Sequence, residues 1–92
     1  MVKTTKSIAA ENTFATAIEL TAGQFNFSLS GTWVATVYVQ KSFDEGVTWL
    51  DVDSFTANTE QVGIEPEGEV YYRFGVKTGG YTSGTVVGRL SQ

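Results

Sequence analysis

The alternation of apolar and polar residues from Val70 to Lys77 is the feature that most constrains the fold. The apolar set is Val70, Tyr72, Phe74 and Val76, and the residues between them are Tyr71, Arg73, Gly75 and Lys77. A period of two residues puts these sets on opposite faces of a β-strand. No window of a dozen residues repeats its apolar positions at helical spacing. The sequence therefore predicts an all-β protein.

The same pattern predicts strands elsewhere in the chain. Gln24–Leu29 alternates cleanly and is expected to end at Ser30-Gly31, while Trp33–Gln40 is apolar on both faces and is predicted to be a central strand. Further strands are expected over residues 4–9, 15–20, 48–52 and 85–90, with one or two within 54–62. Turns are predicted at 65–69 and 79–84. About seven or eight short strands predict a single antiparallel β-sandwich, immunoglobulin-like or jelly-roll.

The length of 92 residues allows one domain with one core. We expect residues 14–92 to form that sandwich. Residues 1–13 are rich in Thr, Lys and Ala and are predicted to be an N-terminal arm that a partner can order.

Composition narrows the possible functions. The chain has no cysteine and no histidine, which excludes disulfides, thiolate chemistry and the commonest general base near neutral pH. The net charge is -4 and the six basic residues are scattered, so we expect no nucleic-acid partner. No apolar stretch reaches the length of a signal peptide or a membrane span. We expect a soluble, non-enzymatic protein made in a cytoplasm, with no cofactor and no membrane partner.

One segment has a motif with a local mechanism. Ser42, Asp44, Gly46, Thr48 and Trp49 fit the pattern Ser-x-Asp-x-Gly-x-Thr-Trp, which resembles the Asp-box, a hairpin motif of sialidase propellers and other β proteins. Asp44 is expected to accept backbone hydrogen bonds in its own turn, Gly46 to adopt a positive φ, and Trp49 to pack the hairpin on the core. The motif could mark a sugar site, but a structural hairpin is the favoured interpretation because the repeats of a propeller are absent.

Other constellations suggest weaker alternatives. Asp51 and Asp53 are expected to share a strand face, where a small hydrolase could use them. Glu65, Glu67 and Glu69, together with Asp51 or Asp53, could supply oxygen ligands to Ca²⁺, although their spacing matches no calcium loop. Exposed coplanar aromatics would suit a carbohydrate-binding module. The candidates for such a platform are Trp33, Tyr38, Tyr71 and Tyr81. We assign no catalytic, cofactor-binding or metal-binding residue.

Residues 25–92 also resemble small proteins encoded among the virion genes of tailed phages. The resemblance lies in Phe27–Leu29, Gly31-Thr32-Trp33, the hairpin 40–51, Tyr72–Gly75 and Tyr81–Val86. It implies a capsid decoration or cement protein that bridges subunits of the major capsid protein. A head–tail or tail accessory protein and a glycan-binding module are the alternatives.

The expected location is therefore the virion, with the chain as a homo-oligomer, either a dimer or a trimer. The residues that we expect to contact a partner come from the N-terminal segment, the turns and the outward strand faces. They are Lys3, Lys6, Ile8, Tyr38, Glu67, Tyr71 and Tyr81.

Overall fold

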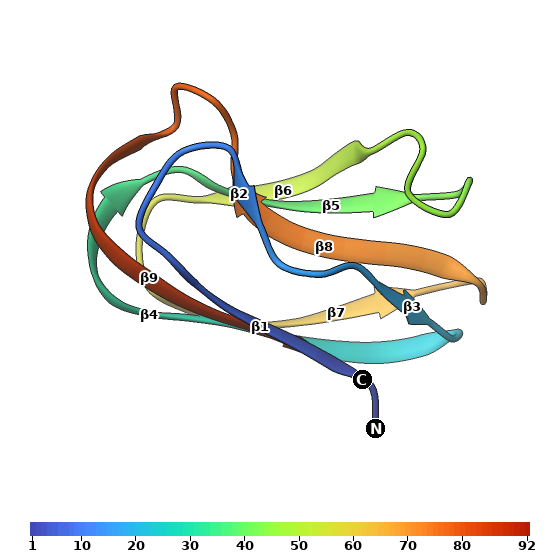
Figure 1. Ribbon diagram of the computed structural model, residues 1–92. Coiled ribbons are helices and arrows are strands. Elements are labelled where there is room, and N and C mark those ends of the chain that lie inside the picture. Colours follow the sequence, from blue (N-terminus) through green and yellow to red (C-terminus); the bar gives the residue numbers. More distant parts are fainter.

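Nine β-strands form two antiparallel sheets in the computed structural model, which describes all 92 residues (Figure 1). The strands are β1 (Lys3–Ile8), β2 (Thr13–Phe14), β3 (Ile18–Leu20), β4 (Gly23–Ala35), β5 (Val37–Ser42), β6 (Leu50–Phe55), β7 (Thr59–Glu65), β8 (Val70–Val76) and β9 (Tyr81–Ser91). Of the predicted strand at 15–20, only the part 18–20 forms a strand, β3, while β2 lies just before it. No helix is present, and so none that could span a membrane.

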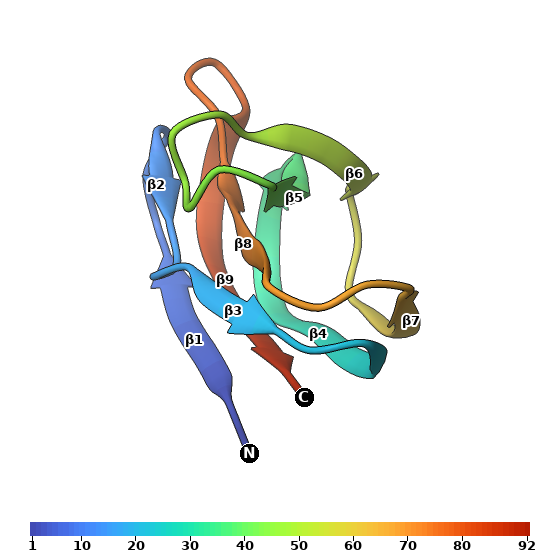
Figure 2. The same cartoon turned by 90° about the vertical axis from the view of Figure 1, so that its right-hand side faces the viewer.

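The two sheets pack face to face as a sandwich, which confirms the predicted fold class. Sheet A has the order β1-β9-β4-β7, and sheet B has the order β2-β8-β5-β6, with β3 also paired to β8. Figure 2 shows β6 and β7, the last strand of each sheet, on one side of the molecule, opposite β1, β2 and β3. The strands β6 and β7 therefore form one open side of the sandwich, which we call the β6–β7 edge.

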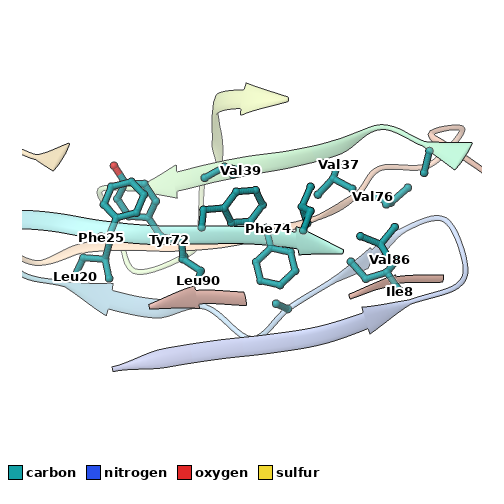
Figure 3. Packing of buried hydrophobic residues seen from close by; sticks show 14 of the residues in the cluster. Ile8, Leu20, Phe25, Val37, Val39, Tyr72, Phe74, Val76, Val86 and Leu90 are labelled. Carbon is teal, nitrogen blue, oxygen red and sulfur yellow. The ribbon is translucent and has the colours of Figure 1, made fainter. Parts of the chain in front are cut away.

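Alternating residues of both sheets fill the core between them (Figure 3). The predicted inward set of β8 is confirmed, because Val70, Tyr72, Phe74 and Val76 are all buried. The ring of Phe74 meets that of Phe27 edge-on at a centroid distance of 5.5 Å. Each large apolar side chain buried in this way stabilises the fold by about 2 kcal/mol.

The predicted central strand at 33–40 is wrong, because the chain changes sheets within it. β4 ends at Ala35 in sheet A, and β5 starts at Val37 in sheet B. Between them, the Thr36 N–H donates to the Gly80 carbonyl at 2.8 Å. The apolar residues on both faces of this segment thus reflect two strands that each contribute to the core.

The long strand β4 does not end at Ser30-Gly31 as predicted. It continues beside β9, which starts at Tyr81 inside the loop predicted over 79–84. The strand pair accommodates Gly84 at φ 83°, where an added Cβ would collide with the Thr32 carbonyl oxygen. Glycine at this position therefore permits the close approach of β4 and β9.

The N-terminal segment belongs to the sandwich and is not an arm. β1 pairs with β9 over six residues, from Lys3 opposite Ser91 to Ile8 opposite Val86. Ile8 has no exposed surface and joins the core, so its predicted role as a partner contact is wrong. Its apolar side chain is buried by the chain itself, and the domain starts before residue 14.

Most connections carry the chain from one sheet to the other. The links β1–β2, β3–β4, β4–β5, β6–β7, β7–β8 and β8–β9 all cross between the sheets. Only β5 and β6 are antiparallel neighbours joined directly within one sheet, and their loop contains the Ser42–Trp49 motif.

Candidate functional site

The β5–β6 hairpin is held by hydrogen bonds among its own motif residues. The Ser42 hydroxyl donates to Asp44 Oδ1 at 2.6 Å, and the Thr48 backbone N–H donates to the same oxygen at 2.8 Å. The Ser42 Oγ atom accepts the Gly46 N–H at 2.8 Å, and Gly46 has a φ of 90°. The bonds from Ser42 and Thr48 hold the pKa of Asp44 below its usual value. These contacts confirm the predicted roles of Asp44 and Gly46.

Trp49 packs differently from the prediction. Its indole lies over Gly46, where an added Cβ would be 3.3 Å from Trp49 Cζ2, and over the guanidinium of Arg73. It therefore covers the outer face of sheet B and is not part of the core. The hairpin thus places Trp49 on the outer face of its own sheet. The motif shows that its last residue is aromatic, but it does not show which face of the sheet that residue covers.

Arg73 is the centre of an ordered cluster on this outer face. Its guanidinium carbon lies 3.9 Å from the ring centroid of Phe14 and 4.4 Å from that of Trp49, so that two aromatic rings flank it. The Arg73 Nε–H donates to Gln40 Oε1 at 2.9 Å. Partial burial lowers the pKa of Arg73, although the group remains charged at neutral pH.

The cluster continues across sheet B through polar contacts. Gln40 Nε2 donates to Asp51 Oδ1 at 2.9 Å, and Lys77 Nζ donates to Asp51 Oδ2 at 2.6 Å. The Lys77 ammonium also lies 4.1 Å from the ring centroid of Tyr38. The hydrogen bonds to Lys77 and then Gln40 lower the pKa of Asp51. We call the residues Phe14, Tyr38, Gln40, Trp49, Asp51, Arg73 and Lys77 the outer cluster.

Tyr71 lies on the same outer face, beyond Arg73 along β8. It is opposite Glu19 of β3 on one side and Ser42 of β5 on the other. The charge of Glu19 raises the pKa of Tyr71, with smaller contributions from desolvation, Glu45 and Glu69. This end of the face is thus acidic, while the Arg73 end has the basic side chains.

The β6–β7 edge combines apolar and acidic side chains. Nine large apolar residues of the chain are exposed, and six of them lie in the β5–β6 hairpin, β6 or β7. These six are Phe43, Val47, Leu50, Val52, Val62 and Ile64. Residues 42–72 also contain eight of the ten carboxylates and no Lys or Arg. This part of the chain is therefore acidic and carries most of the exposed large apolar side chains.

The predicted partner contacts do not form one surface. Lys3 and Lys6 are exposed on β1, at the opposite side of sheet A from β7, while Glu67 is exposed in the turn before β8. Tyr38 and Tyr71 are half-buried on the outer face of sheet B. Tyr81 packs against the core and donates its hydroxyl to the Gly84 carbonyl at 2.9 Å.

The predicted aromatic platform is not present as one plane. Trp33 packs against the core, and its indole N–H donates to Asn58 Oδ1 at 2.7 Å. Tyr81 is also turned toward the core, so only Tyr38 and Tyr71 share an outer face, with Arg73 between them in the register of β8. Four coplanar exposed rings are therefore not available.

The paired carboxylates are also separated. A bulge in β6 sets Asp51 opposite Gln40 but Asp53 opposite Val39, and these two residues of β5 point to opposite faces. The prediction that Asp51 and Asp53 share a face is wrong for this reason. No group of three or more acidic side chains is close enough together to hold a metal ion.

Two shallow hollows interrupt the surface. One, of about 280 Å³, is lined entirely by polar residues on the outer face of sheet A, namely Asn26, Ser28, Glu60, Arg89 and Ser91. In it, Ser28 donates its hydroxyl to Glu60 Oε2 at 2.5 Å. The other, of about 320 Å³, lies between Trp33, Thr56 and the turn at Gly79 and Gly80. Neither hollow contains the outer cluster.

The sequence predictions missed most of the outer cluster. Phe14 lies on β2, Gln40 on β5 and Arg73 on β8, with Lys77 directly after β8. These strands pair only in the folded chain. The alternation of β8 did place Arg73 and Lys77 on one face, but it contains no information on which strands lie beside them.

The chain has no significant match to a known family, to a curated protein or to a solved structure.

Proposed function

We propose that the protein is a non-enzymatic structural component of a phage particle, a decoration protein that binds the major capsid protein through the β6–β7 edge. The observation that supports binding at this edge is its composition. Seven exposed carboxylates and six exposed apolar side chains lie within residues 43–69, a stretch of the sequence that contains no Lys or Arg. The phage assignment itself follows from the resemblance of residues 25–92 to virion proteins.

The partner surface that fits this edge is basic with apolar side chains between its charges. Val62 lies opposite Asn26, and Ile64 lies opposite Gln24, on the outer face of sheet A. Both side chains are about two-thirds exposed, at 66% and 68%. Burying these two side chains against a partner would favour binding by about 1.5–3 kcal/mol each at most. The surrounding carboxylates would steer a basic surface into place.

Each copy would join neighbouring capsid subunits by such contacts. Over a symmetric shell, many modest contacts together raise the heat or force needed to open it. A homo-oligomer, either a dimer or a trimer, would present two or three such edges at once.

Counting copies of the chain in purified particles tests this proposal. Mass spectrometry with cryo-electron microscopy should find hundreds of copies that follow the shell lattice. A handful of copies at the neck or tail would show that the chain is a head–tail or tail accessory protein and not a decoration protein. Absence from particles would refute a structural role. Sedimentation of the purified chain separates the expected dimer or trimer from a monomer.

A variant experiment tests the surface. Val62→Ser combined with Ile64→Ser should lower occupancy on shells at least tenfold, because the apolar contact is lost. The matched control is Val87→Ser, since Val87 is also exposed on sheet A but lies on β9, away from this edge. Equal occupancy of both variants would move the binding surface elsewhere.

A further inference from the structure

Arg73 is a half-buried cation with no counterion in its own chain. The single ion pair of the structure joins Lys77 to Asp51, and no carboxylate lies within 4 Å of Arg73. Its fixed partner is the neutral amide of Gln40. A guanidinium that has lost part of its hydration without gaining a counterion favours an anion supplied from outside.

The terminal nitrogens of Arg73 are free to bind that anion. Only Nε makes a hydrogen bond within the chain. Every buried side-chain nitrogen or oxygen has a hydrogen-bond partner, so the two terminal nitrogens, which have none, must be reachable by solvent. Both terminal nitrogens of the planar guanidinium therefore keep N–H donors that have no partner within the chain.

The surrounding side chains fix the orientation of this plane. The ring centroids of Phe14 and Trp49 lie 3.9 Å and 4.4 Å from its central carbon, and Gln40, which is itself bonded to Asp51, accepts the Nε–H. An oriented guanidinium loses little rotational freedom when it binds. Its open edge matches the two oxygens of a carboxylate.

We propose that the outer cluster is a binding site for an aspartate or glutamate side chain of a partner protein, with Arg73 making a two-point contact to its carboxylate. A protein source fits because neither hollow of the surface lies over Arg73, so nothing here encloses a free small molecule. The site lies on the outer face of sheet B and shares Asp51 with the β6–β7 edge, but the edge suits a basic partner surface whereas Arg73 suits an acidic side chain.

A pair of peptides on the isolated chain tests the site. Acetyl-Gly-Asp-Gly-amide and acetyl-Gly-Asn-Gly-amide differ only in the carboxylate. In ¹H–¹⁵N spectra, the aspartate peptide should give saturable shifts of the Arg73 Nε–H and Trp49 indole N–H signals, while the Trp33 indole, bound to Asn58, stays in place. Equal shifts with both peptides, or none with either, would overturn the proposal.

Two further arms sharpen the result. Arg73→Lys keeps the charge but removes the planar fork, and should weaken the aspartate peptide at least tenfold, whereas Arg89→Lys on sheet A should not. If Arg73→Lys fails to fold, the peptide comparison on the unmodified chain still decides. Tighter binding of inorganic phosphate than of the aspartate peptide would refute the carboxylate assignment. None of these measurements requires phage particles. The carboxylate site can therefore be refuted while the proposed function stands, and the proposed function can be refuted while the site stands.

Discussion

The Tyr72 hydroxyl donates a hydrogen bond to Glu65 Oε1 at 2.8 Å where β7 ends beside the core. Both residues are almost fully buried, at 3% and 2% exposed. The other carboxyl oxygen of Glu65 accepts the Glu67 backbone N–H at 3.2 Å. Each oxygen of the buried Glu65 carboxyl group thus accepts a hydrogen bond, and the group ties the turn 66–69 to β8.

Replacing Tyr72 with Phe should destabilise the protein. The substitution leaves Glu65 Oε1 buried without a donor, which costs about 1–3 kcal/mol in the free energy of unfolding. Urea denaturation measures this loss. Tyr38→Phe is the control, because the Tyr38 hydroxyl makes no hydrogen bond within the chain, and it should change stability by less than about 0.5 kcal/mol. Similar losses in both variants would contradict the role of Glu65.

The same residue makes the fold sensitive to alkali. Burial, followed by the hydrogen bond to Glu65 and its charge, raises the pKa of Tyr72 above the ordinary value of 10.0. An unfolded chain loses this proton near pH 10 while the folded chain keeps it, so the unfolded state binds fewer protons and stability falls as the pH rises. The raised pKa of Tyr72 therefore contributes its full stabilisation below pH 10. Above pH 10 this contribution to the free energy of unfolding is lost, at up to about 1.4 kcal/mol per pH unit.

Urea titrations at pH 9, 10 and 11 measure this effect as the difference between the wild type and Tyr72→Phe. The variant retains Tyr71, so the difference isolates Tyr72. The stability gap should narrow above pH 10, and a gap independent of pH would show that the hydroxyl does not titrate as inferred.

Ser42→Ala should loosen the β5–β6 hairpin. Ser42 is fully buried, and its oxygen accepts the Gly46 N–H and binds Asp44. Losing this acceptor leaves a backbone N–H without its partner and should cost about 1–3 kcal/mol. Amide exchange at Gly46 and Thr48 should accelerate more than exchange in β8. The exposed Ser7→Ala on β1 provides the control, and faster exchange at Gly46 in that variant would count against a local effect.

Gly88→Ala should disturb the core at Phe74. An added Cβ on Gly88 would overlap the Phe74 ring, which has no exposed surface and little room to move. The expected cost is about 1–3 kcal/mol in thermal unfolding. Gly68→Ala is the comparison, because its nearest neighbour would be the Ala22 nitrogen at 3.9 Å. If both substitutions are tolerated equally, the packing at Phe74 is looser than the structure indicates.

The proposed partner binding should weaken in salt. Screening reduces attraction between a basic surface and exposed carboxylates such as Glu60 and Glu67. Glu67→Gln should slow association with shells a few-fold at low salt and leave thermal stability unchanged. Binding kinetics on immobilised shells, recorded at two salt concentrations, measure the association rate. Lys3→Gln, on the opposite side of sheet A, should not slow association, and a slower rate there would place the contact on β1.

The alternation of residues predicted the strand faces well and the strand partners poorly. The inward set of β8 and the hydrogen bonds of the 42–49 hairpin were predictable, because each depends on residues a few positions apart. The sheet change at Thr36 and the bulge at Val52 depend instead on what lies opposite in space. The sequence of each strand contains no information on that neighbour.

The N-terminal segment illustrates the same limit. Residues 1–13 are polar enough to suggest a mobile arm, but β9 pairs with β1 and buries Thr4 and Ile8. The outer cluster could not be predicted for a similar reason, since Phe14 and Trp49 meet Arg73 only after β2 and the hairpin have taken their places.

The repeated passage of the chain between the two sheets has a consequence for folding kinetics. Neither sheet can be completed from one continuous stretch of sequence, because β1 pairs with β9 and β4 pairs with both β7 and β9. Loops between distant parts of the chain must close before most native contacts form, which makes such topologies slow to fold. The β5–β6 hairpin is the exception that can form locally, and we expect it to form early and to act as a nucleus for the remainder of the sandwich.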